Sequence, residues 1–143
     1  MFKVKNIMKT NVIYVTKDTP INKAIELLRK NNITGMPVVN EDKTLAGIIS
    51  EKDVVKLLYT PINQNNKVEN YMTKKVIAFD HEASIISIAD CFIKNNFRRV
   101  PILANGKVVG IISRKDVISY ILEMQQIGEA ELALITMHQK SKS

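Results

Sequence analysis

Hydrophobic positions along the chain follow two spacings, and the spacings change in a regular order. Residues 11–15 form a short run of β-branched and aromatic residues, which is typical of a strand. After Pro20 the apolar positions recur at the i, i+3, i+4, i+7 spacing of a helix that buries one face. Two short apolar runs, 36–40 and 45–50, are separated by the polar turn EDKT and predict a hairpin. A second helix is expected to begin near Ser50.

The same order occurs a second time. The stretch LAGIISEKDVVKLL from Leu45 matches VVGIISRKDVISYI from Val108, and NIMKTNVIYV from Asn6 matches NYMTKKVIAF from Asn70. The offset is 64 residues early in the repeat and 63 late in it, so one residue is missing from the second hairpin turn. That shorter turn contains Asn105-Gly106, a strong hairpin signal. The helical apolar positions of the two copies are Ile21, Ala24, Ile25 and Leu28, then Ile85, Ile88, Ala89 and Phe92. Each helix is expected to end at an Asn-Asn pair, 31–32 or 95–96, because Asn tolerates left-handed backbone conformations.

The sequence therefore predicts an α/β (α+β) chain built from two β-α-β-β-α repeats, packed sheet to sheet with pseudo-twofold symmetry. A single repeat of about 60 residues is too small to bury a generous core alone. We expect repeat 1 at residues 1–60, a linker at 61–69, repeat 2 at 70–122, and a helical or flexible tail at 123–143. In that tail Ile127, Ala130 and Leu134 suggest an amphipathic helix interrupted at Gly128.

Composition excludes several classes of protein. Hydrophobic residues make up 45% and charged residues 24% of the chain, and no apolar run reaches the roughly 18 residues of a membrane helix. The N-terminal stretch lacks the pattern of a signal peptide, so we expect a soluble cytoplasmic protein. The lone Cys91 is expected to be buried, and two histidines without a second cysteine argue against a zinc site. The net charge of +7 is scattered along the chain, which argues against a basic arm and leaves phosphate-containing ligands open.

The repeated Ser-x-x-Asp motif allows two interpretations. Ser50 and Asp53, and likewise Ser113 and Asp116, resemble a capping box at the start of a helix. The same carboxylate could accept two hydrogen bonds from the hydroxyls of a ribose, as an acidic residue does in dinucleotide folds. An isolated motif favours the cap, and both interpretations can hold at once.

Two copies of this motif, together with the Met-x-x-x-Val-Ile starts at Met8 and Met72 and the strands that begin at Pro37 and Pro101, resemble the CBS (cystathionine β-synthase) domain pair, or Bateman module. The resemblance implies clefts between the repeats that bind adenosine-containing ligands such as AMP, ADP or ATP. It leaves open S-adenosylmethionine, NAD and cyclic di-AMP. It also implies a non-enzymatic regulatory function, a homodimer, and an effector protein acting in trans.

Carried onto this sequence, the resemblance assigns roles residue by residue. Asp53 and Asp116 would hold ribose. Ribose or phosphate contacts would come from Ser50, Ser113, Arg98, Arg99, Arg114 and Lys115. The adenine pocket would be lined by Thr10, Val12, Ile13, Thr34, Gly35, Met36, Pro37, Lys74, Val76, Ile77, Val100 and Pro101. No catalytic or metal-binding residue is expected.

The half-sites are expected to be unequal. Arg98-Arg99 in the second repeat stands where the first has the uncharged Thr34-Gly35, so we expect phosphate to lie toward the arginines. The sequence does not decide which aspartate serves the same ligand, and a surface salt bridge is the alternative role for Arg99. A nucleic-acid-binding protein and a purely structural dimerisation module remain as alternative functions, although no nucleic-acid-binding motif and no membrane segment is visible.

Overall fold

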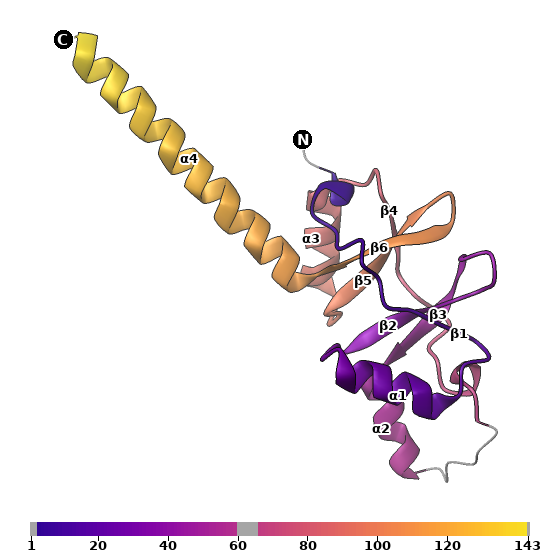
Figure 1. Ribbon diagram of the computed structural model, residues 1–143. Coiled ribbons are helices and arrows are strands. Elements are labelled where there is room, and N and C mark those ends of the chain that lie inside the picture. Colours follow the sequence, from indigo (N-terminus) through magenta and orange to yellow (C-terminus); the bar gives the residue numbers. More distant parts are fainter. Residues whose placement is uncertain (1–2, 60–65, 143) are drawn as a thin grey trace.

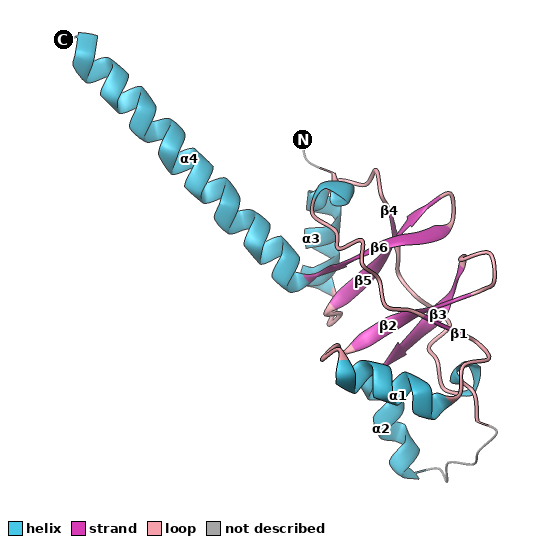
Figure 2. Ribbon diagram, in the orientation of Figure 1, coloured by secondary structure: helices cyan, strands magenta, loops and turns pink. Residues whose placement is uncertain are grey.

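The structure, a computed structural model, describes residues 3–59 and 66–142 and contains two three-stranded sheets with helices packed on them (Figure 1, Figure 2). The first sheet has the order β1-β2-β3 and the second β4-β5-β6; in each, the first pair is parallel and the second antiparallel. The elements are η1 Val4–Asn6, β1 Val15–Thr16, α1 Ile21–Lys30, β2 Gly35–Val39, β3 Leu45–Ser50, α2 Glu51–Val55, η2 Lys56–Tyr59, η3 Val68–Asn70, β4 Phe79–Asp80, α3 Ile85–Lys94, β5 Arg99–Ala104, β6 Lys107–Ser113 and α4 Arg114–Lys142. The α+β class and the twofold repeat are confirmed.

The helices and hairpins lie where the sequence predicts them. Asn32 ends α1 with a φ of 50°, so this Asn adopts the expected left-handed conformation. Asn105 and Gly106 turn the second hairpin with φ values of 53° and 77°, which suits the twist of the strands they join. The longer first hairpin needs one positive φ, 69° at Lys43. The missing residue therefore changes only the turn.

Three expectations need correction. Residues 11–14 are not in a strand, because β1 pairs with β2 only at Val15 and Thr16 and the preceding segment contacts the other sheet. Asn95 ends α3 in an extended conformation, φ −131°. The tail helix is not interrupted at Gly128: α4 runs unbroken from β6 to Lys142 and projects away from both sheets (Figure 1). The linker expected at 61–69 stays a prediction, because residues 60–65 lie outside the described part of the chain.

Each repeat places its leading segment on the sheet of the other repeat. Lys9 exchanges two backbone hydrogen bonds with Ile111 of β6, with N···O distances of 2.8 and 2.9 Å. Thr73 does the same with Ile48 of β3, at 2.8 and 2.9 Å. After these contacts the two chain segments cross over and enter β1 and β4 of their own halves. Neither half is therefore complete without the other.

These contacts also establish the pseudo-twofold symmetry. Adding 64 to Lys9 gives Thr73 and adding 63 to Ile48 gives Ile111, so the two crossing contacts map onto each other. Between the sheets, Thr44 forms a bridge with Lys107, its own repeat equivalent. A contact between equivalent residues must lie on or beside the axis. The two hairpins thus meet at the axis.

The exchanged segments also contribute to the two hydrophobic cores. Val4 is fully buried among residues of the second half, including Ile88, Ile102 and Ile112. Val68, its equivalent, is fully buried in the core of the first half. Complete burial of a valine side chain contributes about 1.5–3 kcal/mol. The free energy of unfolding of each core thus depends on the other repeat's leading segment.

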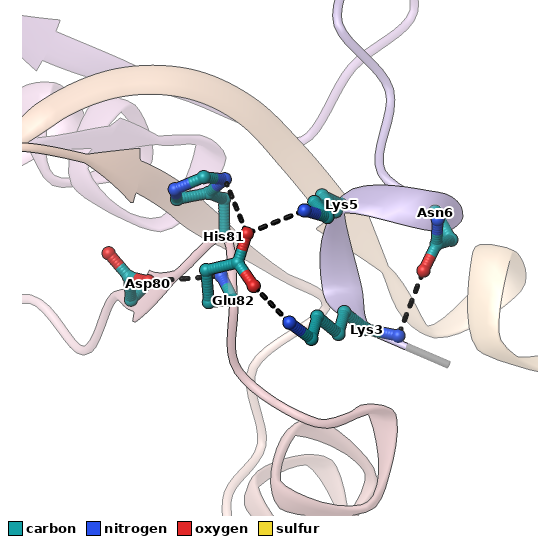
Figure 3. A network of polar contacts seen from close by, with 6 residues as sticks. All are labelled: Lys3, Lys5, Asn6, Asp80, His81 and Glu82. Atoms are coloured by element: carbon teal, nitrogen blue, oxygen red, sulfur yellow. Dashed lines mark hydrogen bonds and ion pairs between the residues drawn. The ribbon is translucent and has the colours of Figure 1, made fainter. Parts of the chain in front are cut away.

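Ion pairs hold the N-terminal segment at its outer end (Figure 3). Glu82 accepts hydrogen bonds from the ammonium groups of both Lys3 and Lys5. These two cations lower the pKa of Glu82 to about 2. All three side chains are exposed, so the cluster positions η1 more than it stabilises the fold.

Two glycines permit the crossing contacts. A Cβ at Gly47 would lie 2.6 Å from the Thr73 carbonyl oxygen, and one at Gly110 would overlap Met8 and lie 3.0 Å from the Lys9 carbonyl oxygen. These glycines begin the repeated Gly-Ile-Ile-Ser motif. The motif therefore includes a glycine because the backbone of the other repeat passes directly over it.

We predict opposite effects for alanine at two glycines. Gly47→Ala should lower the free energy of unfolding by about 1–3 kcal/mol, since a backbone oxygen must move. Gly128→Ala, where the new Cβ would meet nothing within 4 Å, should raise it by up to about 1 kcal/mol if the distal part of α4 unfolds together with the body. Urea denaturation measures both. An unchanged stability for Gly47→Ala would contradict the close crossing.

Candidate functional site

A cleft of about 600 Å³ lies between the two repeats. One wall is the junction of β3 with α2, and the other is the segment before β5 together with the crossing loop that follows η3. The lining residues are Thr34, Gly35, Ile48, Ser50, Glu51, Lys52, Thr73, Lys75, Val76, Ile77, Asn95, Asn96, Phe97, Arg98, Arg99 and Val100. The cleft thus joins the serine motif of the first repeat to the arginine pair of the second.

The first wall is fixed by a capping box. The Ser50 hydroxyl accepts a hydrogen bond from the Asp53 backbone N–H, with an N···O distance of 3.4 Å. The Asp53 carboxylate accepts from the Ser50 backbone N–H and from the Ser50 hydroxyl, both at 3.0 Å. The expected cap is therefore present, with Asp in the position where Glu or Gln is more usual.

Asp53 also connects the two repeats. Its side chain is buried, and its second carboxylate oxygen accepts a hydrogen bond from the Thr73 hydroxyl at 3.0 Å. Ser50 and Thr73 both line the cleft, and the hydroxyl groups of both donate to the buried Asp53 carboxylate. Its carboxylate orients both hydroxyl groups.

The second repeat has a similar box but a different partner. The Asp116 carboxylate accepts from the Ser113 backbone N–H at 2.8 Å and from the Ser113 hydroxyl at 3.0 Å. Its other oxygen lies 3.8 Å from the ammonium of Lys9, a largely exposed side chain. Lys9 is the repeat equivalent of Thr73. A hydroxyl in one half is thus replaced by a cation in the other.

Arg99 occupies the cationic wall of the cleft. Its Nη1 donates to the Gly35 carbonyl oxygen at 3.4 Å, and its buried Nε–H has no hydrogen-bond partner among the described residues. Burial lowers the pKa of Arg99, while the negative charges of Asp116 and Glu51 oppose that change. No ion pair of Arg99 is present in the part of the chain that the structure describes, so its guanidinium is left with an unused donor.

The structure separates the residues expected at the site into three groups. The cleft is lined by Thr34, Gly35, Ser50, Val76, Ile77, Arg98, Arg99 and Val100. Met36, Pro37 and Pro101 are fully buried within β2 and β5, and Asp53 is buried behind the cleft. The third group does not line this cleft. It consists of the exposed Lys74, the segment equivalent to it in the first repeat, and the serine motif of the second repeat: Thr10, Val12, Ile13, Ser113, Arg114, Lys115 and Asp116. Their binding roles remain predictions.

Several lining residues were missed from the sequence. Thr73, Lys75, Asn95, Asn96 and Phe97 line the cleft. From the sequence we expect the Asn pair only to end a helix, and no pattern there marks Phe97 as a lining residue. No sequence signal marks Thr73, because it reaches the cleft through the crossing of its segment onto β3, a long-range contact.

The comparisons with known proteins identify the family. The family model for the CBS domain matches residues 4–60 and residues 68–123. The chain belongs to the CBS domain family, with two copies of the domain.

Individual relatives agree with this assignment. The protein MJ1225 of Methanocaldococcus jannaschii is 34% identical over 118 residues; the match covers 82% of this chain, which spans only 42% of that relative. The crystal structure of CBSX2 in complex with AMP has a TM-score of 0.78 at 25% identity, covering 87% of this chain and 99% of the other. The CBS domain pair of MJ0100, solved with 5′-methylthioadenosine and S-adenosyl-L-methionine, has a TM-score of 0.74 at 29% identity, covering 87% and 98%.

Across the described residues, no helix combines the length and the apolar character needed to cross a membrane. The same residues contain no group of three or more His, Cys, Asp or Glu side chains placed to hold a metal ion.

We predict that Asp53 contributes more to stability than Asp116. Asp53→Ala removes the cap and the Thr73 contact of a buried carboxylate, which should lower the free energy of unfolding by about 2–3 kcal/mol. Asp116→Ala removes the cap and only a long ion pair with the exposed Lys9, and should cost about 1 kcal/mol. Urea denaturation of both variants measures the difference. Thr73→Val, which removes only the hydroxyl group that donates to Asp53, should show part of the loss seen in Asp53→Ala. Equal losses for the two aspartates would contradict a connecting role for Asp53.

Proposed function

We propose that this chain is a non-enzymatic sensor that binds an adenosine-containing nucleotide in the cleft between its repeats. The observation that carries the proposal is the composition of the cleft, which is apolar at one part and cationic at another. Val76, Ile77 and Phe97 supply apolar surface for a base, and Arg98 and Arg99 supply cations for a phosphate. A nucleotide needs both kinds of surface at once.

Ribose fits between these two regions. Ser50 and Thr73 line the cleft, and Asp53 holds the hydroxyl groups of both. We propose that a ribose diol bonds to these hydroxyls, and that Asp53 itself reaches the diol only when Thr73 releases it. This pairs the first-half aspartate with the second-half arginines, a combination that the sequence left open.

Phosphate recognition rests on Arg99. Arg99 lines the cleft, and its Nε–H is buried without a partner among the described residues. We propose that the guanidinium shifts toward an anionic oxygen in the cleft, because this exchanges a buried unpaired donor for charge-assisted hydrogen bonds. Arg98, Lys52 and Lys75 add positive charge to the same cleft, and Glu51 opposes it. We therefore propose AMP as the first ligand to test, followed by ADP and ATP. This order is supported by the AMP complex of CBSX2, and the MJ0100 complex adds S-adenosylmethionine to the candidates.

The proposed output is mechanical. A ligand that contacts both walls would fix the two repeats relative to each other, because the crossing segments already connect each wall to both cores. We propose that an effector protein in trans, in the cytoplasm, reads this change. A nucleic-acid-binding function is the second candidate, and it rests only on the net charge of +7.

Nucleotide binding should raise the melting temperature of the chain. A ligand that binds only the folded state at a hundredfold excess over its Kd adds about 2.7 kcal/mol of stability. We expect AMP to raise the melting temperature in this way. Arg98→Gln removes one charge-assisted contact, so the variant should need at least about ten times more AMP for the same rise. Arg29→Gln on α1, outside the cleft, is the matched control.

The screen should include ADP, ATP, S-adenosylmethionine, NAD and cyclic di-AMP at millimolar concentration. No shift with any of them would refute the sensor proposal. Binding of RNA or DNA that weakens steeply with salt would favour the alternative function.

We further propose that the chain forms a homodimer through helical surfaces. Val55, Leu58 and Tyr59 of the first half are exposed apolar residues, and adding 63 gives Ile118, Ile121 and Leu122. All six are about half or more exposed. Both halves thus present an apolar surface at equivalent positions, and exposed apolar surfaces of this kind are typical of sites where a second copy binds.

Charge introduced on this surface should separate the dimer. The double variant Leu58→Glu/Ile121→Glu should sediment as a monomer at micromolar concentration, because two carboxylates would be buried without partners. Ile86→Glu changes an equally apolar exposed residue on α3 and should leave the dimer intact. Sedimentation equilibrium tests this; a monomeric native chain would overturn the dimer alone.

A further inference from the structure

Gly35 and Arg99 are equivalent residues of the two repeats, and they contact each other. They are 64 residues apart, the offset of the early part of the repeat. Gly35 is the cross-strand partner of Ser50, and Arg99 is the cross-strand partner of Ser113. Arg99 begins beside the serine of its own half, yet its Nη1 donates to the Gly35 carbonyl oxygen of the other half at 3.4 Å.

This contact places one cation near the pseudo-twofold axis. Gly35 contributes no side chain there, and a Cβ on it would meet only ordinary contacts, the nearest at 3.5 Å. The local backbone therefore does not require glycine. Because Gly35 has no side chain, only the second half extends a side chain, that of Arg99, toward the other half at this contact.

The surroundings of Arg99 come from both halves. Glu51 follows Ser50, and Asp116 belongs to the Ser113 box; both carboxylates act on the Arg99 charge. Neither forms an ion pair with it among the described residues, and Nε remains without a partner there. Arg99 also lines the cleft that contains Ser50. One guanidinium is thus positioned between two serine motifs.

We propose that Arg99 is a specificity-determining residue shared by the two half-sites, so that anionic ligands at the Ser50 cleft and at the Ser113 half-site compete for one guanidinium. This inference rests on the proposed nucleotide binding. A phosphate in the Ser50 cleft attracts the Arg99 guanidinium, whose shift toward the cleft releases the buried Nε–H and draws the cation away from the Ser113 half-site. A second nucleotide at the Ser113 half-site then binds more weakly, because its phosphate meets the negative charge of Asp116 without the positive charge of Arg99 nearby.

Calorimetric titration of the full chain with AMP and with adenosine tests this coupling. We expect a second AMP to bind at least about tenfold more weakly than the first, or not at all, whereas adenosine, which has no phosphate, should bind the two half-sites with more similar affinities. Arg99→Gln should weaken the first AMP and bring the two affinities together. Arg98→Gln, the neighbouring arginine without the Gly35 contact, should weaken AMP and leave the ratio of the two affinities unchanged.

Each outcome is decisive. If Arg99→Gln binds AMP too weakly to measure, the comparison of AMP with adenosine on the native chain decides. The quantity compared is the ratio of the affinities for the first and the second ligand. If this ratio is no larger for AMP than for adenosine, or if Arg99→Gln leaves the AMP ratio unchanged, Arg99 is not shared by the half-sites. Nucleotide binding itself would still stand. Absence of binding by both AMP and adenosine overturns the proposed function itself, and with it this inference.

Discussion

The fold depends on the close passage of each leading segment over the last strand of the other repeat. Thr73 pairs with Ile48, and Lys9 with Ile111, at points where a glycine removes the side chain that would block the passage. This passage brings Val4 and Val68 into the opposite cores. It also places Thr73 against the Ser50 box, so the same constraint that holds the halves together builds one wall of the cleft.

Near-symmetry of the backbone makes the chemical differences between the halves informative. Equivalent positions hold Thr73 and Lys9, and Gly35 and Arg99. Each of these differences lies at a half-site, while the strands that carry them pair in the same register. The two half-sites therefore share a geometry and differ in charge, which is how one duplicated fold can treat two ligands differently.

The repeat itself could be predicted from the sequence, because hydrophobic spacing, Asn-Gly turns and the Ser-x-x-Asp boxes are local signals. The helices and hairpins followed from them. The crossing could not be predicted, because the pairing of Lys9 with Ile111 is a long-range contact without a local pattern. For the same reason residues 11–15 looked like a full strand, and the cleft residues Thr73 and Asn95 were missed. The capping interpretation of Asp53 was correct, but its bond to the other repeat was not visible in the motif.

The central claim is that the cleft between the Ser50 box and the Arg98-Arg99 pair is a nucleotide site. A crystal structure of the chain with AMP tests this most directly. The account predicts the base against Val76 and Ile77, the ribose at the Ser50 and Thr73 hydroxyls, and the phosphate on Arg99. AMP bound elsewhere, or bound in this cleft with its phosphate directed away from both arginines, would contradict it.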